Sequence, residues 1–217
     1  AHPLATKAGI EMLEKGGNAV DAAIAVQLAL AVVYPNAGNL GGGGFMVHFD
    51  NQTKKLSVYD GRETAPQSVT PSMFLNDQNE SIGFIKAKTS GLSTGVPGMV
   101  SMLSLAHQDH GKLAWGEQFD YAKKLARTGF SVSPRLHGMI ERFGKYIPST
   151  KEEGTLDAHN YFFDSSGKPI PLGGLLKNPD YENTLELISQ DSMNFYRGEI
   201  ADKIIEQVKQ EPRAGGM

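Results

Sequence analysis

The feature that most limits how this chain can fold is an apolar run, Ala19 to Val33, in which only Asp21 and Gln27 are polar. A membrane-spanning helix needs about 20 such residues, so this shorter run predicts a helix buried in a protein core. Asn18 is a favoured N-cap residue. Tyr34-Pro35 ends the helix, because the residue before a proline avoids helical angles. Such a helix needs apolar neighbours on nearly every side.

Two further segments flank this helix. A first helix is predicted over Thr6 to Lys15, with Ala8, Met12 and Leu13 turned inward, and the glycines that follow it stop the helix. After the apolar helix and a glycine-rich loop, two segments alternate apolar and mixed residues: Phe45 to Phe49 and Lys55 to Tyr59. The polar residues 51–54 between them predict a β-hairpin.

The rest of the chain is mostly helical in pattern. Pro97 suits a first helical position, with Met99, Met102, Leu103 and Ala106 following at helical spacing. Further helices are predicted over Trp115 to Thr128, from Ser133 to Gly144, after Asn178-Pro179, and over Glu199 to Gln210. Residues 148–174 show no steady period and predict a loop with one short strand at Tyr161 to Phe163. The fold class is therefore α+β, in one domain, with an early hairpin and a mostly helical C-terminal half.

Composition excludes several classes of function. The 217 residues are 40% hydrophobic and 21% charged, which is typical of a globular protein. A net charge of −3 argues against a nucleic-acid partner, which would usually require a basic face. The chain has no cysteine, so disulfides, thiolate metal sites and a cysteine nucleophile are absent from it.

The four glycines 41–44 suggest a dinucleotide-binding loop, but the context argues against one. Such loops follow a strand and open a helix, whereas here a helix precedes and a strand follows. A second interpretation is that the glycines let the backbone pass close to another element. A third is that the loop lies beside an active site. The sequence does not separate the second from the third.

Arg62-Glu63, just past the second predicted strand, is the more informative pair. An arginine can hold a carboxylate through two parallel hydrogen bonds and stays charged at any relevant pH. From residue types alone, an ordinary ion pair is the commoner explanation. His107, Asp109 and His110 also suggest a metal site, but two histidines at a helix end without a third strong ligand do not make one.

Several motifs, in order, resemble the gamma-glutamyltranspeptidase family. His2-Pro3-Leu4-Ala5 and residues 16–23 resemble its opening, and residues 38–46 and Arg62-Glu63-Thr64-Ala65-Pro66 follow at the expected distances. The match continues through residues 95–98, 125–130 and 195–201, and it fades within Glu211 to Met217. Each motif alone is weak, but their order and spacing together are specific.

The resemblance implies an N-terminal-nucleophile hydrolase, a four-layer αββα sandwich made from one precursor that cleaves itself into a large and a small subunit. The N-terminal threonine of the small subunit would attack gamma-glutamyl amides such as glutathione and pass the acyl group to water, amino acids or peptides. This chain would be the N-terminal portion of the large subunit, would contain no catalytic residue, and would require no metal or cofactor. Arg62 would hold the substrate's α-carboxylate, with Glu63 beside it in a role left open. The compartment implied is the periplasm or the cell exterior.

Two alternatives remain open. One is a related acylase of the same fold, such as a cephalosporin acylase, and the other is a non-catalytic homologue or fragment. Arg62 favours gamma-glutamyl substrates, since a clamp for an amino-acid carboxylate suits them.

Overall fold

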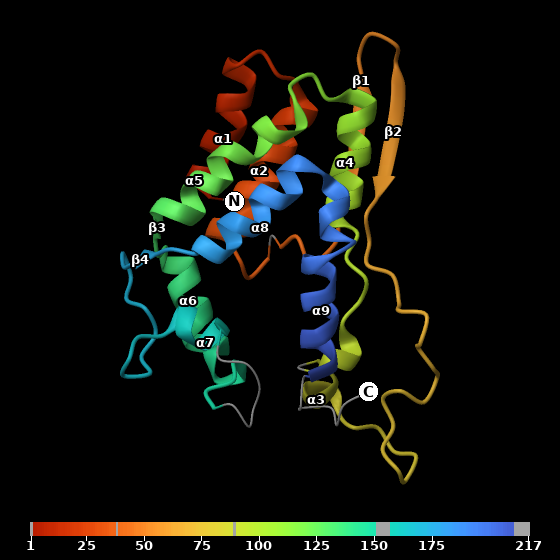
Figure 1. Ribbon diagram of the computed structural model, residues 1–217, viewed down its shortest axis with the longest axis vertical. Helices are drawn as coiled ribbons and strands as arrows, with labels where there is room; N and C mark the ends of the chain where they lie inside the picture. The colour runs from red at the N-terminus through yellow and green to blue at the C-terminus, as the bar shows by residue number, and fades with distance from the viewer. Residues whose placement is uncertain (1, 38, 89, 151–156, 211–217) are drawn as a thin grey trace. The chain divides into compact units, whose positions relative to one another are not determined.

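A computed structural model describes residues 2–37, 39–88, 90–150 and 157–210 (Figure 1). The chain divides into two compact units. Unit 1 comprises Ala1–Thr64, Val96–Phe130 and Leu175–Gly198, and unit 2 comprises Ala65–Gly95, Ser131–Gly174 and Glu199–Met217. The predicted single domain stays a prediction.

Unit 1 begins with two packed helices, α1 (Pro3–Glu14) and α2 (Ala19–Val33). A β-carbon at Gly9 of α1 would lie 2.7 Å from a methyl carbon of Val26, so the glycine lets the two helices approach closely. The predicted start at Thr6 is wrong by three residues. His2 caps the helix by accepting the N–H of Leu4, and the proline at the first helical position needs no hydrogen-bond partner.

Two of the three residues predicted to face inward from α1 do so. Ala8 and Met12 are buried, whereas Leu13 is 52% exposed, so its predicted inward direction is wrong. Gly16 adopts a left-handed conformation with φ of 87°, which confirms the predicted helix stop.

The N-terminal end of α2 carries a buried carboxylate. Asn18 caps the helix as predicted, and Asp21 accepts a hydrogen bond from the N–H of Asn18, which completes a capping box. Asp21 is fully buried and also accepts hydrogen bonds from the N–H groups of Lys112 and Leu113 and from Nε2 of Gln118. These donors satisfy a charge that would otherwise be costly to bury. The carboxylate thus joins α2 to a segment about ninety residues later.

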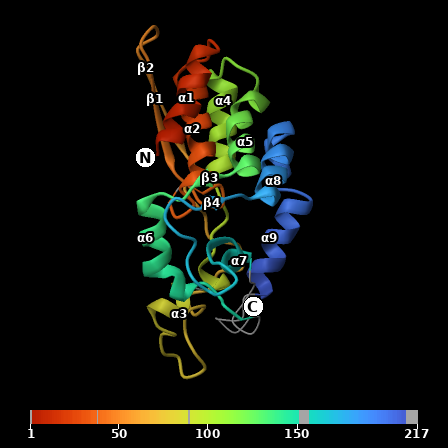
Figure 2. The same ribbon diagram turned by 90° about the vertical axis from the view of Figure 1, so that its left-hand side faces the viewer.

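The predicted hairpin is confirmed as β1 (Phe45–Asp50) and β2 (Lys55–Asp60), antiparallel, with Val47 opposite Val58. One of its faces lies on α4 (Met99–His110): Tyr59 is buried and His48 stacks on His110, with ring centroids 4.0 Å apart. The opposite face is apolar and exposed. It consists of Phe45, Val47, Phe49, Leu56 and Val58, each 56–65% exposed. We call these five residues the outer hairpin face; Figures 1 and 2 show the hairpin beside the helices of unit 1.

Two helices of unit 1 begin at other residues than predicted. Pro97 lies before the N-cap Gly98, so α4 begins at Met99 and not at the proline. The predicted helix over Trp115–Thr128 is divided into a 3-10 helix, η2 (Trp115–Phe119), and α5 (Asp120–Thr128), which Gly129 ends with φ of 89°. The other elements of this unit are β4 (Leu175–Leu176), α8 (Pro179–Gln190) and the 3-10 helix η4 (Ser192–Phe195). The short strand β3 (Phe130–Ser131), which pairs with β4, begins at the last residue of this part of unit 1.

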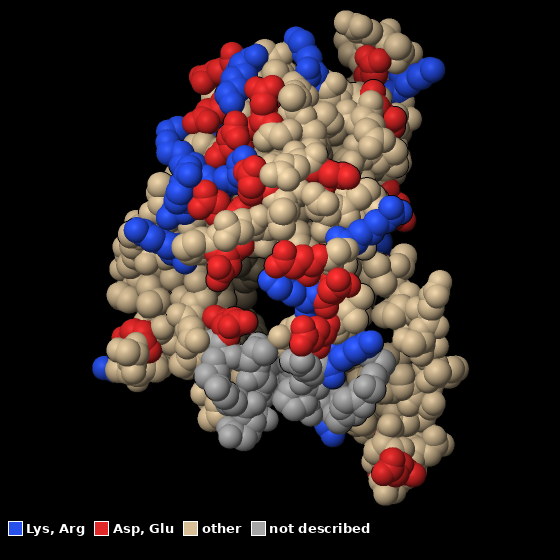
Figure 3. Space-filling model, in the orientation of Figure 1, with Lys and Arg blue, Asp and Glu red and all other residues tan. Residues whose placement is uncertain are grey.

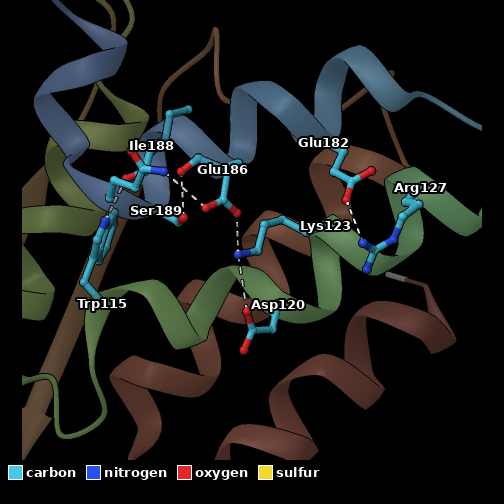
Figure 4. Close-up of polar contacts among 9 residues, drawn as sticks. Trp115, Asp120, Lys123, Arg127, Glu182, Glu186, Ile188 and Ser189 are labelled. Carbon is cyan, nitrogen blue, oxygen red and sulfur yellow. Dashed lines mark hydrogen bonds and ion pairs between the residues drawn. The ribbon is translucent and has the colours of Figure 1, made fainter.

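Helices α5 and α8 pack together and are joined by ion pairs at their surface (Figure 4). Nζ of Lys123 lies 2.9 Å from Glu186 and 3.4 Å from Asp120, and Arg127 pairs with Glu182 at 3.2 Å. Acidic and basic side chains are interspersed on this part of the surface (Figure 3). Trp115 donates its ring N–H to the carbonyl of Ile188, which fixes η2 on α8.

The helices described in unit 2 are α3 (Phe84–Lys88), η1 (Gly91–Ser93), α6 (Pro134–Phe143), η3 (Gly144–Tyr146), α7 (Asp157–Phe162) and α9 (Glu199–Gln210). The strand predicted over Tyr161–Phe163 is wrong, because α7 occupies most of it and only Phe163 forms an isolated bridge, with Pro169. Part of the predicted loop, residues 151–156, lies outside the described residues.

The observed elements confirm an α+β fold with an early hairpin and a mostly helical C-terminal half. Among the described residues, no helix combines the length and the hydropathy that a membrane crossing requires. The long apolar helix α2 contributes Ile24, Leu28 and Val33 to the core, and none of these side chains is more than 1% exposed.

Candidate functional site

Arg62 and Glu63 directly follow β2, at a point where the backbone is paired on both sides. Gly61 and Gly44 exchange two backbone hydrogen bonds of 2.9 and 3.2 Å, and Thr64 and Val96 exchange two of 2.8 and 3.2 Å. The Arg62-Glu63 dipeptide therefore lies between two backbone anchors. Side chains that must bind a ligand in a fixed geometry are best carried by such rigid backbone.

Asp60 adds a third anchor. Its Oδ1 accepts the backbone N–H of Arg62 at 2.8 Å, the arrangement of an Asx-turn. Sequence reasoning did not single out Asp60, although the Asp-x-Arg spacing is the pattern such a turn produces.

The two side chains of the dipeptide touch only loosely. Nε of Arg62 lies 3.4 Å from Oε2 of Glu63, and the side chains are 72% and 31% exposed. Oε2 of Glu63 is itself shut off from solvent and accepts no well-directed hydrogen bond from the described residues, so the 3.4 Å contact is electrostatic. The arginine partner is largely exposed, so solvent weakens the contact. The guanidinium thus stays available to an external anion.

A pocket of about 650 Å³ opens beside Glu63 within unit 1. Met46, Met99, Met102 and Leu103 give it an apolar lining. Its other lining residues are Ala23, Gln27, Ala37, Asn39, Gly42, Gly43, Gly44, Phe45, Val47 and Glu63. Arg62 does not line the pocket, but its neighbour does. The pocket is open and presents polar and apolar surface in similar measure, and Glu63, which lines it, contacts the exposed cation Arg62.

The glycine loop passes close to the backbone of this dipeptide, which confirms the interpretation of the glycines as a close approach. A β-carbon at Gly43 would lie 2.9 Å from the backbone nitrogen of Glu63. The carbonyl of Gly42 accepts the N–H groups of Gly98 and Met99. The loop also lines the pocket, so close packing and proximity to the candidate site both hold.

The histidines considered for a metal have other contacts. Nε2 of His107 lies 2.9 Å from the carbonyl oxygen of Leu113, and His110 stacks on His48. Asp109 accepts the hydroxyl of Tyr59, and burial, together with this carboxylate, raises the pKa of Tyr59. The described part of the chain holds no group of three or more His, Cys, Asp or Glu side chains placed to bind a metal ion.

The chain shows clear likeness to known proteins. The sequence profile described as gamma-glutamyltranspeptidase matches residues 5–217. The glutathione hydrolase proenzyme of Bacillus subtilis is 35% identical over 210 residues, which are 96% of this chain and 35% of that protein. The crystal structure of Helicobacter pylori gamma-glutamyltranspeptidase is 33% identical with a TM-score of 0.91, over 100% of this chain and 60% of that one.

A more distant likeness is to the structure of cephalosporin acylase from Bacillus halodurans, with 27% identity and a TM-score of 0.75 over 94% of this chain and 37% of that one. The chain spans about a third of the length of the glutathione hydrolase proenzymes that it matches. The profile match covers nearly the whole chain and agrees with the ordered motifs around Arg62. The chain therefore belongs to the gamma-glutamyltranspeptidase family.

Proposed function

We propose that the chain is the N-terminal portion of the large subunit of a gamma-glutamyl transferase, or glutathione hydrolase. The complete protein would cleave gamma-glutamyl amides, glutathione among them, and transfer the acyl group to water, amino acids or peptides. The observation that carries the proposal is Arg62, whose side chain is 72% exposed while its backbone is anchored on both sides. A cation held on rigid backbone beside a pocket suits the recognition of a small carboxylate.

In this proposal Arg62 binds the α-carboxylate of the glutamyl group through its planar fork. Glu63 orients it: a carboxylate 3.4 Å from Nε favours guanidinium orientations that keep Nε toward Glu63 and leave the two terminal nitrogens for the substrate. The proposed role of Glu63 is positioning, since its contact is with Arg62.

The nucleophile is proposed to lie in the remainder of the protein, as the N-terminal threonine of a small subunit. Its hydroxyl would attack the gamma-carbonyl carbon while its own amine takes the proton, and the amine of the substrate would leave. Water or an acceptor amine would then release the acyl group. The chain's part in this chemistry is to place the substrate, because the described site supplies a cation and a pocket.

The four-layer αββα arrangement is likewise a proposal. It is supported by the outer hairpin face, whose five apolar side chains are 56–65% exposed in this chain. Apolar strand faces of this extent usually pack on another layer. In the complete protein a second sheet would cover it. A periplasmic or extracellular location is proposed from the family resemblance alone.

A second candidate function is that of an acylase, favoured by the likeness to the cephalosporin acylase. The two candidates differ in what Arg62 must recognise. A gamma-glutamyl substrate presents an α-carboxylate a fixed number of bonds from the scissile amide, and an arginine can bind that carboxylate directly.

The test compares two substrates of the complete, processed protein: gamma-glutamyl p-nitroanilide and its analogue that lacks the α-carboxylate. A charge-assisted contact contributes about 1.5–3 kcal/mol, or about one to two powers of ten in affinity. Wild-type protein should prefer the first substrate by about that factor. Arg62→Ala should abolish the preference, and Arg62→Lys should reduce it, because lysine lacks the planar fork.

Arg127→Ala is the matched control, since Arg127 is a comparably exposed arginine that pairs with Glu182 on a helix surface. Its preference should equal that of the wild type. If Arg62→Ala keeps the wild-type preference, Arg62 is an ordinary surface ion pair and the proposal fails.

A further inference from the structure

Gly43 lies against the backbone that carries Arg62. A β-carbon at this position would lie 2.9 Å from the backbone nitrogen of Glu63 and 3.0 Å from Cα of Arg62, and it would overlap the carbonyl oxygen of Gly61. Real β-carbons essentially never come closer than 3.0 Å to another heavy atom. All three neighbours are backbone atoms, so no side-chain rotation can relieve the overlap. Any side chain at position 43 must therefore move backbone.

The backbone directly before Arg62 is itself closely packed. A β-carbon at Gly61 would lie 2.6 Å from Cβ of Met102 and 3.0 Å from the carbonyl oxygen of Gly98, so that the backbone there already rests on α4. Closely packed elements transmit strain and do not absorb it. An added methyl group at position 43 would consequently be accommodated by moving the loop or by moving Arg62 and Glu63.

Asp60 fixes the same segment through a hydrogen bond and not through close packing. Its Oδ1 accepts the N–H of Arg62 at 2.8 Å. This bond fixes the backbone of the arginine directly, whereas the Gly44–Gly61 and Thr64–Val96 pairs fix the residues on either side of the dipeptide. Gly43 and Asp60 thus constrain Arg62 by two independent means: excluded volume and one hydrogen bond.

We infer that Gly43 and Asp60 are positioning residues for the Arg62 side chain; this inference rests on the proposed function, in which Arg62 binds the substrate's α-carboxylate. Neither residue needs to touch substrate through its side chain. Together they set where the guanidinium stands relative to the pocket beside Glu63. The glycine is required at position 43 because the loop must pass within contact distance of the clamp.

The experiment measures the substrate preference defined above, α-carboxylate against no α-carboxylate, in the complete processed protein. A misplacement of about 1 Å can cost about a hundredfold in rate. Gly43→Ala should raise KM for gamma-glutamyl p-nitroanilide by about tenfold or more, with kcat changed less than about threefold. The variant should turn over the analogue without the carboxylate almost as fast as the wild-type protein does. Its preference for the substrate with the α-carboxylate should therefore fall.

Gly41→Ala is the matched control from the same loop. A β-carbon there would meet only Oδ1 of Asn39, at 3.4 Å, which is an ordinary contact, and the N–H bond to Asn39 is kept. This variant should retain the wild-type preference. If Gly41→Ala and Gly43→Ala lower the preference equally, the effect is a general loosening of the loop and the inference is wrong.

Substitutions of Asp60 test the inference without adding atoms to the packed loop. They therefore remain informative if the Gly43→Ala protein does not fold. Asp60→Ala removes the acceptor for the Arg62 N–H and should lower the preference about tenfold. Asp60→Asn keeps a side-chain oxygen at the same place and should restore most of it. Equal losses on both substrates, or no rescue by asparagine, would mean a purely structural role and would overturn the inference.

Arg62→Ala separates this inference from the proposed function. If Arg62→Ala abolishes the preference while Gly43→Ala and Asp60→Ala leave it intact, the positioning inference alone fails. If Arg62→Ala leaves it intact as well, the proposed function fails, and the inference fails with it.

Discussion

The hydroxyl of Tyr59 donates a 2.8 Å hydrogen bond to Oδ2 of Asp109, which joins the second strand of the hairpin to the C-terminal end of α4. Tyr59 is buried, with 7% of its surface exposed. The bond links β2 to α4 beside the stacked rings of His48 and His110. The bond therefore adds to the packing that holds the hairpin on α4.

Tyr59→Phe should lower the free energy of unfolding of the complete protein by about 0.5–1.5 kcal/mol at pH 7, the usual net value of one hydrogen bond. Burial, then Asp109, raises the pKa of the hydroxyl above 10 in the folded state. Because the pKa of the hydroxyl is higher in the folded than in the unfolded state, the protonated hydroxyl stabilises the fold. This stabilisation is complete below the unfolded pKa and is lost as the pH rises through the folded pKa. The difference between Tyr59→Phe and wild type in urea denaturation should thus be constant to about pH 9 and shrink at higher pH. A difference that grows above pH 10 would contradict the hydrogen bond.

Removing the carboxylate of Asp21 should be far more costly. Asp21→Ala leaves the N–H groups of Lys112 and Leu113 without their acceptor, and leaves the amide of Gln118 with only its long contact to the carbonyl of Ala114. The change should destabilise the protein by about 3–5 kcal/mol. Thermal unfolding measures the loss. Asp120→Ala is the control, because that carboxylate is 57% exposed and its pairing with Lys123 contributes about 0–1 kcal/mol. Equal losses in the two variants would show that the buried network is not stabilising.

The apolar helix α2 gives a prediction about packing. Leu28 is 1% exposed, and Leu28→Ala should cost about 2–5 kcal/mol through the lost burial and the cavity left behind. Leu13→Ala on α1 removes the same atoms from a side chain that is 52% exposed, and should change stability by less than about 1 kcal/mol. Urea denaturation of both variants checks the contrast. A loss below about 1 kcal/mol for Leu28→Ala would mean that the helix is not core.

The isolated chain, residues 1–217, should release no p-nitroaniline from gamma-glutamyl p-nitroanilide, since the proposed nucleophile lies elsewhere. It should also be poorly stable and self-associate through the outer hairpin face. Val47→Lys, in the centre of that face, should reduce self-association in sedimentation velocity experiments. Activity that persists after rigorous removal of any companion polypeptide would contradict the proposal that the nucleophile lies outside these residues.

Local patterns predicted the elements whose ends carry a strong signal. Asn18 and Gly129 cap or stop helices through their own backbone preferences, and the hairpin follows from alternation and a polar turn. The first helix starts earlier than predicted because histidine is not a common N-cap. The strand predicted at residues 161–163 is wrong because sequence preference is a weak guide over so short a segment.

The candidate site shows the same limit. The position of Arg62 just past a strand could be predicted, because it depends on residues next to it in sequence. The contact of Gly43 with this segment could not, since two stretches of chain must first meet in space. Asp60 was predictable in principle from its two-residue spacing to Arg62 and was not recognised. The bonds of Asp21 to residues more than ninety positions away leave no trace in any local pattern.

That separation has a consequence for the order in which the protein can fold as it is made. When α2 leaves the ribosome, the carboxylate of Asp21 has only the N–H of Asn18 and water as partners, because Gln118 comes 97 residues later. At about 5–20 residues per second, the wait is roughly 5 to 20 seconds. During that interval the N-terminal end of α2 stays hydrated and α1 and α2 can pair only along their apolar sides. The buried carboxylate therefore makes the final packing of the first helices depend on synthesis of the α4–η2 connection.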